Sequence, residues 1–235
     1  MKLKNFDFTQ KVYLHPEHVV KLKNKGRPFP MTIEVDLTNH CNHRCSFCCW
    51  GEDIAVDKST LDTKIIKKCI HDMKKLGAKA ICFTGGGEPM IHKDFYQILS
   101  FTKKNELDCG LITNGSAITK EHCLELVNNL QWIRVSVSGG DAVSYNKVQG
   151  KDHFERVINN IEMVAKEKVK NNNNIKIGIR MLVNEVNLYT LSKLAKRIQN
   201  INGINYLQIS PNQFSDDEGK FWNGPDVDNE IKKTE

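Results

Sequence analysis

Residues 34–48 of this 235-residue chain are EVDLTNHCNHRCSFC, a short β-rich run that leads directly into three closely spaced cysteines. Cys41, Cys45 and Cys48 are separated by three and then by two residues. Thiolates are strong ligands for zinc and for iron–sulfur clusters, and three at this spacing can surround one compact inorganic centre. The stretch therefore predicts a metal or cluster site in a loop that follows a strand.

The ligands around this loop leave two kinds of centre open. A structural zinc site normally takes four ligands, commonly from two separated pairs, and no second Cys/His pair is visible. His40 and His43 are candidate fourth ligands, although a polar loop histidine is the commoner case, and Cys49 is poorly placed because adjacent residues seldom both point at one ion. A four-iron cluster held by three thiolates instead leaves one iron free to bind something else.

Six β-rich runs alternate with segments of helical periodicity, which favours an α/β fold with a parallel sheet and helical crossovers. The first connection, residues 38–57, lacks a helical pattern, and a structureless connection of that length is usually functional. The expected strands are residues 33–37, 80–84, 109–113, 132–137, 176–183 and 206–210.

Three helices are expected where apolar residues recur every three or four positions. The first begins at Ser59, which forms a pattern like a capping box with Asp62, and it ends at Gly77. The other two have apolar stripes over residues 154–165, ended by the asparagine run 171–174, and over residues 188–201, closed by Gly203. Single cysteines within apolar stretches are interpreted as small buried residues, and these are Cys69, Cys82, Cys109 and Cys123.

Glycine-containing turns follow the next three expected strands. Residues 84–89 are TGGGEP, residues 113–115 are TNG and residues 135–140 are VSVSGG. Glycines after a strand let the backbone approach a ligand closely, and Glu88 adds one carboxylate there. Parallel strands end at the same edge of a sheet, so we expect these turns and the cysteine loop to gather on one rim, where parallel α/β barrels assemble their active sites.

Together these segments resemble those of the radical S-adenosylmethionine superfamily, over about residues 31–211. The cysteine pattern is similar to the family's C-x3-C-x2-C loop, and Phe47 matches the aromatic residue that often precedes the last cysteine. The three turns resemble the family's GGE, TNG and vSlDG segments. In two places the chain departs from the family: Ser138 replaces the usual acidic residue of the fourth segment, and Gln149 stands where many relatives carry arginine.

The resemblance implies a partial (β/α)6 TIM-like barrel of parallel strands, open on one side. It also implies one [4Fe–4S] cluster held by Cys41, Cys45 and Cys48, with S-adenosylmethionine bound to the unique iron through its amino and carboxylate groups. In the family the GGE segment binds the methionyl amino group. The residues that the resemblance makes candidates for cofactor binding are Phe47, Gly86, Gly87, Glu88, Asn114 and Ser136.

The activity implied by the resemblance is reductive cleavage of S-adenosylmethionine to a 5′-deoxyadenosyl radical, which abstracts hydrogen from a substrate held in the barrel. The expected partners are a small-molecule or peptide substrate and a one-electron donor such as a flavodoxin or ferredoxin. Arg180, in the fifth expected strand, either faces the barrel toward a carboxylate or phosphate or forms a structural salt bridge. The alternative function is a zinc-binding α/β interaction protein without redox chemistry.

The composition is that of a globular protein, with 40% hydrophobic and 26% charged residues, which excludes a disordered or low-complexity chain. A net charge of +6, spread along the chain, disfavours nucleic acid as a partner. No run of about 18 apolar residues and no signal-peptide core is visible. We therefore expect no association with a membrane and a location in the reducing cytoplasm.

The expected domain organisation is an N-terminal extension at residues 1–30, a radical SAM core domain at 31–211 and a polar C-terminal tail at 212–235. No cysteine follows Cys123, so we expect no C-terminal domain with auxiliary clusters. That expectation disfavours reactions in which an additional cluster receives an electron.

Overall fold

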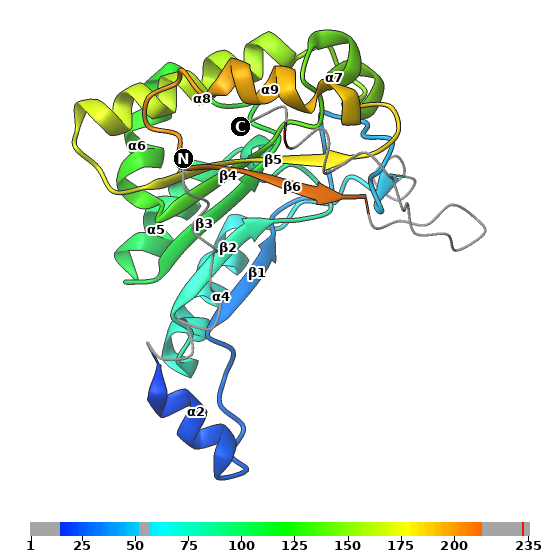
Figure 1. Cartoon of the computed structure of the whole chain (residues 1–235). Helices are drawn as coiled ribbons and strands as arrows, with labels where there is room; N and C mark the ends of the chain where they lie inside the picture. The colour runs from blue at the N-terminus through cyan, green and yellow to red at the C-terminus, as the bar shows by residue number, and fades with distance from the viewer. Residues whose placement is uncertain (1–14, 52–56, 213–231, 233–235) are drawn as a thin grey trace.

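The computed structural model describes residues 15–51, 57–212 and 232, and its core is one curved sheet with helices along its outer side (Figure 1). The six strands pair in the order β1-β2-β3-β4-β5-β6, and every pairing is parallel. Each expected strand is found, with its ends displaced by no more than one residue. The strands are β1 (Thr32–Asp36), β2 (Ala80–Thr84), β3 (Asp108–Thr113), β4 (Trp132–Ser136), β5 (Lys176–Val183) and β6 (Tyr206–Pro211).

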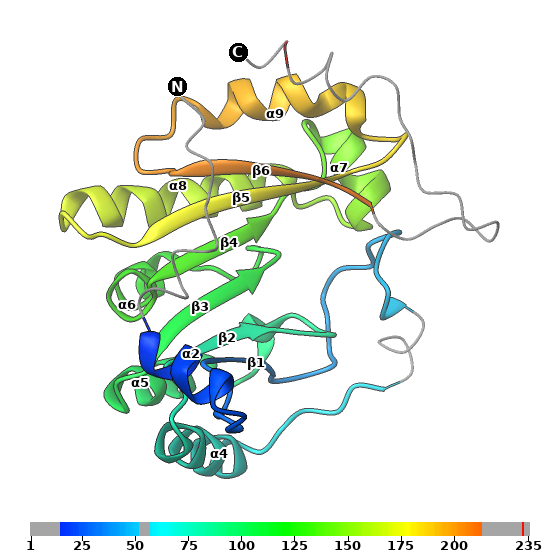
Figure 2. The ribbon, with the colours of Figure 1, turned by 60° about the horizontal axis from the view of Figure 1, so that its bottom comes forward.

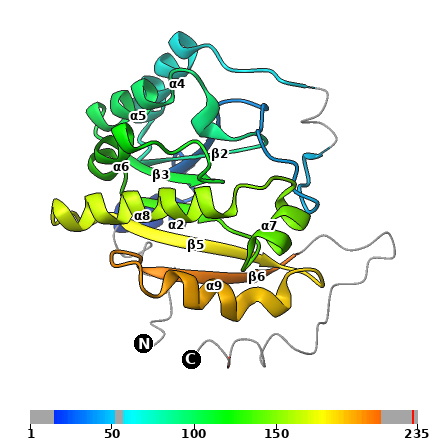
Figure 3. The ribbon, with the colours of Figure 1, turned by 90° about the horizontal axis from the view of Figure 1, so that it is seen from above.

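Because β1 and β6 form the two edges of this sheet, the barrel is partial and open between them (Figure 2). The helices that connect successive strands cover the outer face, as the view from above shows (Figure 3). This confirms the expected partial (β/α)6 barrel. The connecting α-helices are α4 (Thr63–Leu76), α5 (Phe95–Lys104), α6 (Cys123–Asn129), α7 (Ala142–Gln149), α8 (Phe154–Lys170) and α9 (Leu191–Ile198), with 3-10 turns η1 (Pro89–Ile91), η2 (Lys120–His122) and η3 (Leu188–Thr190).

The strands divide their side chains between a packed outer face and an accessible inner face. On β4, Ile133 and Val135 are buried in the core beneath the helices, whereas Arg134 and Ser136 are half-buried. This alternation follows from the two-residue period of a strand. The inner face is therefore where polar side chains can meet a ligand.

The first connecting helix begins later than the sequence predicts. Its N-cap is Asp62, whose carboxylate accepts hydrogen bonds from the N–H groups of Lys64 (2.8 Å) and Ile65 (3.2 Å). Ser59 does not start the helix, because the neighbouring Thr60 is in an extended bridge with Thr38. The predicted box of Ser59 and Asp62 is therefore wrong, although Asp62 alone does cap the helix.

The single cysteines divide three to one. Cys82, Cys109 and Cys123 are buried, as predicted, but Cys69 is exposed. The prediction for Cys69 was wrong because α4 buries only a narrow row that includes Ile66 and Ile70, and Cys69 lies beside this row.

Outside the core, the structure describes one helix before β1, α2 (Pro16–Lys23), which has no buried residue. The predicted tail at residues 212–235 lies outside the described residues except for 212 and 232. Within the part of the chain that the structure describes, no helix is both long and apolar enough to span a membrane.

Candidate functional site

The cysteine loop lies directly against the glycine turn that follows β2. The N–H of Gly87 donates to the carbonyl of Thr38 (3.1 Å), and the N–H of Glu88 donates to the carbonyl of His40 (2.9 Å). These two bonds join the carboxyl ends of adjacent strands through backbone alone. The predicted convergence of motifs on one rim is therefore confirmed for these segments.

Two of the candidate glycines have different surroundings. A Cβ atom added to Gly87 would lie 2.2 Å from the carbonyl oxygen of His40 and 2.4 Å from that of Thr38, so only glycine fits between the two loops. A Cβ atom added to Gly86 would approach no atom more closely than 3.4 Å, at Asn39 Oδ1. Gly87 therefore permits the close packing of the two loops, whereas a methyl group added at Gly86 would meet only ordinary contacts with Asn39 and Trp50.

Glu88 is a buried carboxylate with a nearly complete set of donors. It is 3% exposed, and it accepts hydrogen bonds from the hydroxyl of Thr113 (2.6 Å) and the N–H groups of Asn114 (2.7 Å) and Met90 (3.1 Å). Burial raises the pKa of Glu88, and the three hydrogen bonds act in the opposite direction. A carboxylate has about four acceptor positions, so one remains open, on Oε2.

The TNG turn after β3 holds the cysteine loop through a side-chain network. Asn114 donates from Nδ2 to Asn42 Oδ1 (2.8 Å), and Asn42 donates from its own Nδ2 to the hydroxyl of Ser116 (2.9 Å). Asn114 Oδ1 accepts from both the N–H (2.9 Å) and the hydroxyl (2.7 Å) of Ser116. Because Asn42 directly follows Cys41, this network fixes the start of the cysteine loop relative to Glu88.

Gln149, at the end of α7, joins the fourth turn to the cysteine loop. Its side chain accepts from the N–H of Ser138 (2.6 Å) and donates to the carbonyl of Ser136 (3.3 Å). Its own carbonyl accepts from the N–H of Arg44 (3.3 Å). The two departures from the family pattern, Ser138 and Gln149, are therefore direct partners in this structure.

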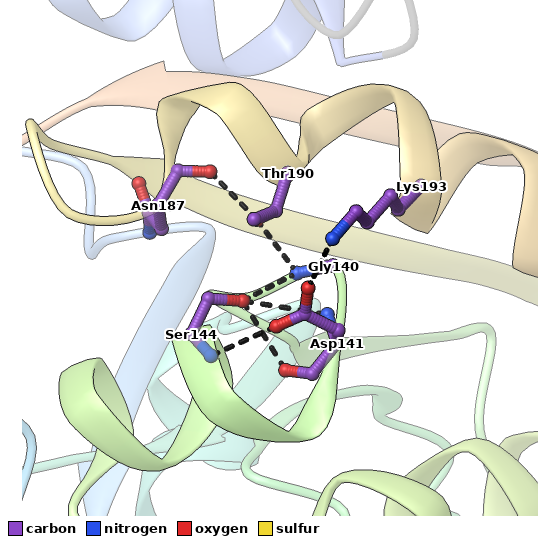
Figure 4. A network of polar contacts seen from close by, with 6 residues as sticks. All are labelled: Gly140, Asp141, Ser144, Asn187, Thr190 and Lys193. Atoms are coloured by element: carbon purple, nitrogen blue, oxygen red, sulfur yellow. Dashed lines mark hydrogen bonds and ion pairs between the residues drawn. The ribbon is translucent and has the colours of Figure 1, made fainter.

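The fourth turn is also tied to the last connecting helix (Figure 4). The N–H of Gly140 donates to the hydroxyls of Ser144 (3.1 Å) and Thr190 (2.9 Å). Asp141 caps α7 through Ser144 (2.9 Å) and pairs with Lys193 on α9 (2.6 Å), and these contacts, with that to Lys193 the largest, lower its pKa to about 2. The turn is thus fixed from outside the barrel.

The three cysteines of the loop lie near one another. Each is half-buried, whereas the adjacent Cys49 is exposed. Burial, with smaller contributions from Cys41 and Cys48, raises the pKa of Cys45 to about 12. Burial also raises the pKa of Cys41 and of Cys48. A bound metal cation would reverse this trend, because it stabilises the thiolate form.

The donor set, three half-buried thiols, suits a cluster with one open iron better than a structural zinc ion, which normally takes four protein ligands. Tetrahedral zinc with Zn–S bonds of about 2.3 Å requires sulfur atoms about 3.8 Å apart. A cubane spreads its thiolates more widely and needs no fourth protein ligand when another molecule occupies the last iron. The donor set therefore fits a [4Fe–4S] cluster.

The predicted fourth ligands for zinc gain no support from the structure. His43 is 2% exposed, and its Nε2 lies 3.1 Å from His153 Nδ1, beneath the loop. Burial lowers the pKa of His43 to about 4, so the ring is neutral at physiological pH. His40 contributes its backbone carbonyl to Glu88.

Sequence reasoning singled out Gly86, Gly87, Glu88 and Asn114 but missed the residues that join them. Asn42 and Thr113 lie within the quoted motifs, yet their pairing with residues up to 72 positions away has no local signal. Phe47 is half-buried and Ser136 lies at the end of β4 on the inner face. The binding of S-adenosylmethionine by the candidate residues stays a prediction.

Comparison with known families gives one match that covers most of the chain. Residues 35–198 match the family model described as the radical SAM superfamily. A probable GTP 3′,8-cyclase from Thermococcus kodakarensis is 30% identical over 142 residues, which are 60% of this chain and 45% of that protein. An AdoMet-dependent heme synthase from Nitratidesulfovibrio vulgaris is 28% identical over 58% of this chain and 37% of that protein. The chain spans half or less of the length of the curated relatives it matches.

Solved structures share the fold. SuiB of Streptococcus suis bound to S-adenosylmethionine superposes with a TM-score of 0.69 at 16% identity, covering 99% of this chain and 53% of SuiB. The structure of anSMEcpe with bound AdoMet gives a TM-score of 0.63 at 18% identity, over 77% of this chain and 51% of the other. The fold, the position of the cysteine loop and the family match agree: the chain belongs to the radical SAM superfamily, whose members use a [4Fe–4S] cluster and S-adenosylmethionine.

Proposed function

We propose that this chain cleaves S-adenosylmethionine reductively at a [4Fe–4S] cluster and abstracts hydrogen from a substrate in the barrel. The observation that carries the proposal is the group of half-buried thiols of Cys41, Cys45 and Cys48, fixed beside the network of Glu88 and Asn114. When bound, the cluster and S-adenosylmethionine together supply an electron-transfer step that breaks a C–S bond and yields a 5′-deoxyadenosyl radical.

The chain's own residues orient these groups. The thiolates of the loop would hold the cluster, and the backbone beside Gly86 would receive the methionyl amino group together with the remaining acceptor position of Glu88. Ser136 lies on the inner face of β4, where it can contact the same ligand. The network from Glu88 through Asn114 to Asn42 holds the cluster ligands and the S-adenosylmethionine site in a fixed position relative to each other.

The substrate is a small molecule or a peptide. The curated relatives bear names as different as GTP 3′,8-cyclase and heme synthase, and SuiB has been solved with its precursor peptide SuiA, so the comparisons span several substrate classes. The reducing electron comes from a one-electron donor such as a flavodoxin or ferredoxin. We place the reaction in the cytoplasm, with neither nucleic acid nor a membrane as a partner.

Anaerobic reconstitution with iron and sulfide tests the proposal, with Cys45→Ser and Cys49→Ser as a matched pair of adjacent loop cysteines. Wild type and C49S should bind about four irons per chain and form 5′-deoxyadenosine from S-adenosylmethionine under dithionite. C45S should do neither while retaining its circular dichroism spectrum. Full iron content and turnover in C45S, or a colourless zinc-loaded wild type, would contradict the assignment.

A further inference from the structure

Two arginines on adjacent strands project from the inner face of the sheet, and neither has a charged partner among the described residues. Arg134 on β4 and Arg180 on β5 are both half-buried. The Nε atom of each is shielded from solvent and has no hydrogen-bond partner. Buried donors are normally paired, so an unpaired guanidinium is an exception that needs an explanation.

No carboxylate compensates these two charges within the described residues. The ion pairs found there involve other cations, and the side chain of Arg180 donates no hydrogen bond to any described residue. Arg134 has one weak contact, from Nη1 to the neutral Oε1 of Gln208 (3.4 Å). Burial and the charge of Arg134 both lower the pKa of Arg180, so the structural salt bridge that the sequence left open is not formed there.

The strand register places these arginines in one region of the inner face. Arg180 lies between Ser136 on β4 and Gln208 on β6, its register partners on the two sides. Arg134 lies two residues before Ser136 and is therefore deeper in the barrel, farther from the rim. Two cations and two neutral polar side chains thus share the same part of the sheet.

Aromatic rings bound this region on the side away from the rim. The ring of Tyr206 occupies the space where Gly178 lacks a side chain, since a Cβ atom there would lie 2.1 Å from Tyr206 Cζ. Trp132 lies across Gly110 in the same way, at 2.2 Å from an added Cβ atom. A ligand at the arginines would therefore meet aromatic surface below it and the polar rim above.

We propose that Arg134 and Arg180 bind an oxyanion of the substrate, a carboxylate or a phosphate, inside the barrel. The inference rests on the proposed function, because it names the class of substrate that the same barrel takes. Guanidinium groups suit such anions, since their planar donors match two oxygens at once. The depth of Arg134 favours a substrate over the carboxylate of S-adenosylmethionine, whose proposed contacts lie at the rim.

Inorganic phosphate is the probe, because S-adenosylmethionine contains no phosphorus and leaves the ³¹P signal free for the anion. The full chain, reconstituted anaerobically and checked for iron content, is titrated with phosphate by ³¹P line broadening, with and without saturating S-adenosylmethionine. Arg134→Gln and Arg180→Gln test the two cations. Arg156→Gln, an exposed arginine near the start of α8 outside the barrel, is the matched control.

Wild type and R156Q should bind phosphate equally well whether or not S-adenosylmethionine is present. Each barrel variant should bind it at least about tenfold more weakly, the expected loss for one charge-assisted hydrogen bond. Phosphate should also raise the melting temperature of wild type but not of R180Q. Arg180→Lys, which keeps the charge if R180Q fails to fold, should retain part of the binding.

Several results would overturn the inference. The site would be excluded if wild type did not bind phosphate. It would also be excluded if R180Q and R180K bound phosphate as tightly as wild type, or if R156Q lost as much affinity as the barrel variants. Displacement of phosphate by S-adenosylmethionine would assign the arginines to the cofactor and not to the substrate. None of these outcomes depends on turnover, and a failure to load iron is measured separately, so the site and the proposed function can fail independently.

Discussion

The two halves of the barrel differ in whether the protein forms hydrogen bonds to a charged group that is shielded from water. On the side of β1 to β3, the carboxylate of Glu88 accepts three hydrogen bonds from the protein. On the side of β4 to β6, the guanidinium of Arg180 donates none to the described residues. Both groups lose water on folding, and among the described residues only the carboxylate gains hydrogen bonds that compensate the loss.

We interpret Glu88 and the turns that it joins as a rigid frame, and the inner face around Arg180 as a binding surface. A buried carboxylate with three protein donors fixes the turns around it, because moving any one of them breaks a buried hydrogen bond. An uncompensated cation contributes nothing comparable to folding and becomes favourable only when an anion arrives. Natural proteins retain such groups at functional sites at some cost in stability. The following variants test this division of the rim.

Replacement of Glu88 by Ala should have the largest effect on stability. It leaves the hydroxyl of Thr113 and the N–H groups of Asn114 and Met90 without an acceptor, and at about 1–3 kcal/mol for each buried donor left unpaired the loss is about 3 kcal/mol or more. The free energy of unfolding in urea should fall by that amount. Glu88→Gln, which keeps one acceptor oxygen, should lose less. A change below about 0.5 kcal/mol for E88A would show that the carboxylate is not part of the frame.

Gly87→Ala should destabilise the chain by about 1–3 kcal/mol, the usual cost of overpacking. The added methyl group collides with the backbone carbonyls of Thr38 and His40, which cannot move without opening the cysteine loop. Gly86→Ala is the control, because its methyl group meets only ordinary contacts. G86A should unfold like wild type in urea yet bind S-adenosylmethionine more weakly by calorimetry. Equal stability of the two variants would contradict the close packing.

The strands were predictable because each strand of a buried parallel sheet is a short β-rich run. Such a run can be recognised in the sequence without knowing which strands lie beside it. The start of α4 was not, since either Ser59 or Asp62 offers a capping oxygen and the bridge between Thr38 and Thr60, which settles the matter, joins distant residues. The burial of Cys69 was wrongly predicted, because the apolar periodicity shows which side of the helix is buried but not how wide the buried row is.

The candidate site was predictable as motifs but not as contacts. The spacing of the cysteines and the glycine turns are local features, and they identified the rim. The bond of Asn42 to Asn114 joins residues 72 positions apart, and only folding reveals that these two amides meet. Arg180 shows the same limit, because the sequence could not decide between a salt bridge and an open face, whereas the ion pairs among the described residues do not include it.

Arg180→Met should raise the free energy of unfolding, by on the order of 1 kcal/mol, because it replaces an uncompensated, partly desolvated cation by an apolar side chain of similar length. The sign distinguishes the two accounts of this residue: a structural ion pair would make the variant less stable. Urea unfolding in a buffer without phosphate or carboxylate measures it, since a bound anion would stabilise wild type. A loss of stability in R180M would place Arg180 with the frame.

The smallest effect is expected at Asp141, a charge on the β4 to β6 side that lies outside the barrel and is compensated. Its folded pKa of about 2 lies below the ordinary value of 3.8, so its contribution to stability is present above pH 3.8 and is lost as the pH falls through about 2. Asp141→Asn keeps a good helix cap but removes the charge. Because its partner Lys193 is largely exposed, the loss at pH 7 should be below about 1 kcal/mol.

The difference in unfolding free energy between wild type and D141N, measured in urea from pH 7 to pH 2, should therefore shrink below pH 4. Lys193→Met should cause a similar loss at pH 7, and the double variant should add little to either single change, because both remove the same pair. A difference that stays constant down to pH 2 would assign the effect to the cap of α7 and not to the charge. In that case the ion pair with Lys193 would contribute nothing measurable to stability, and the cap of α7 alone would account for the effect of Asp141.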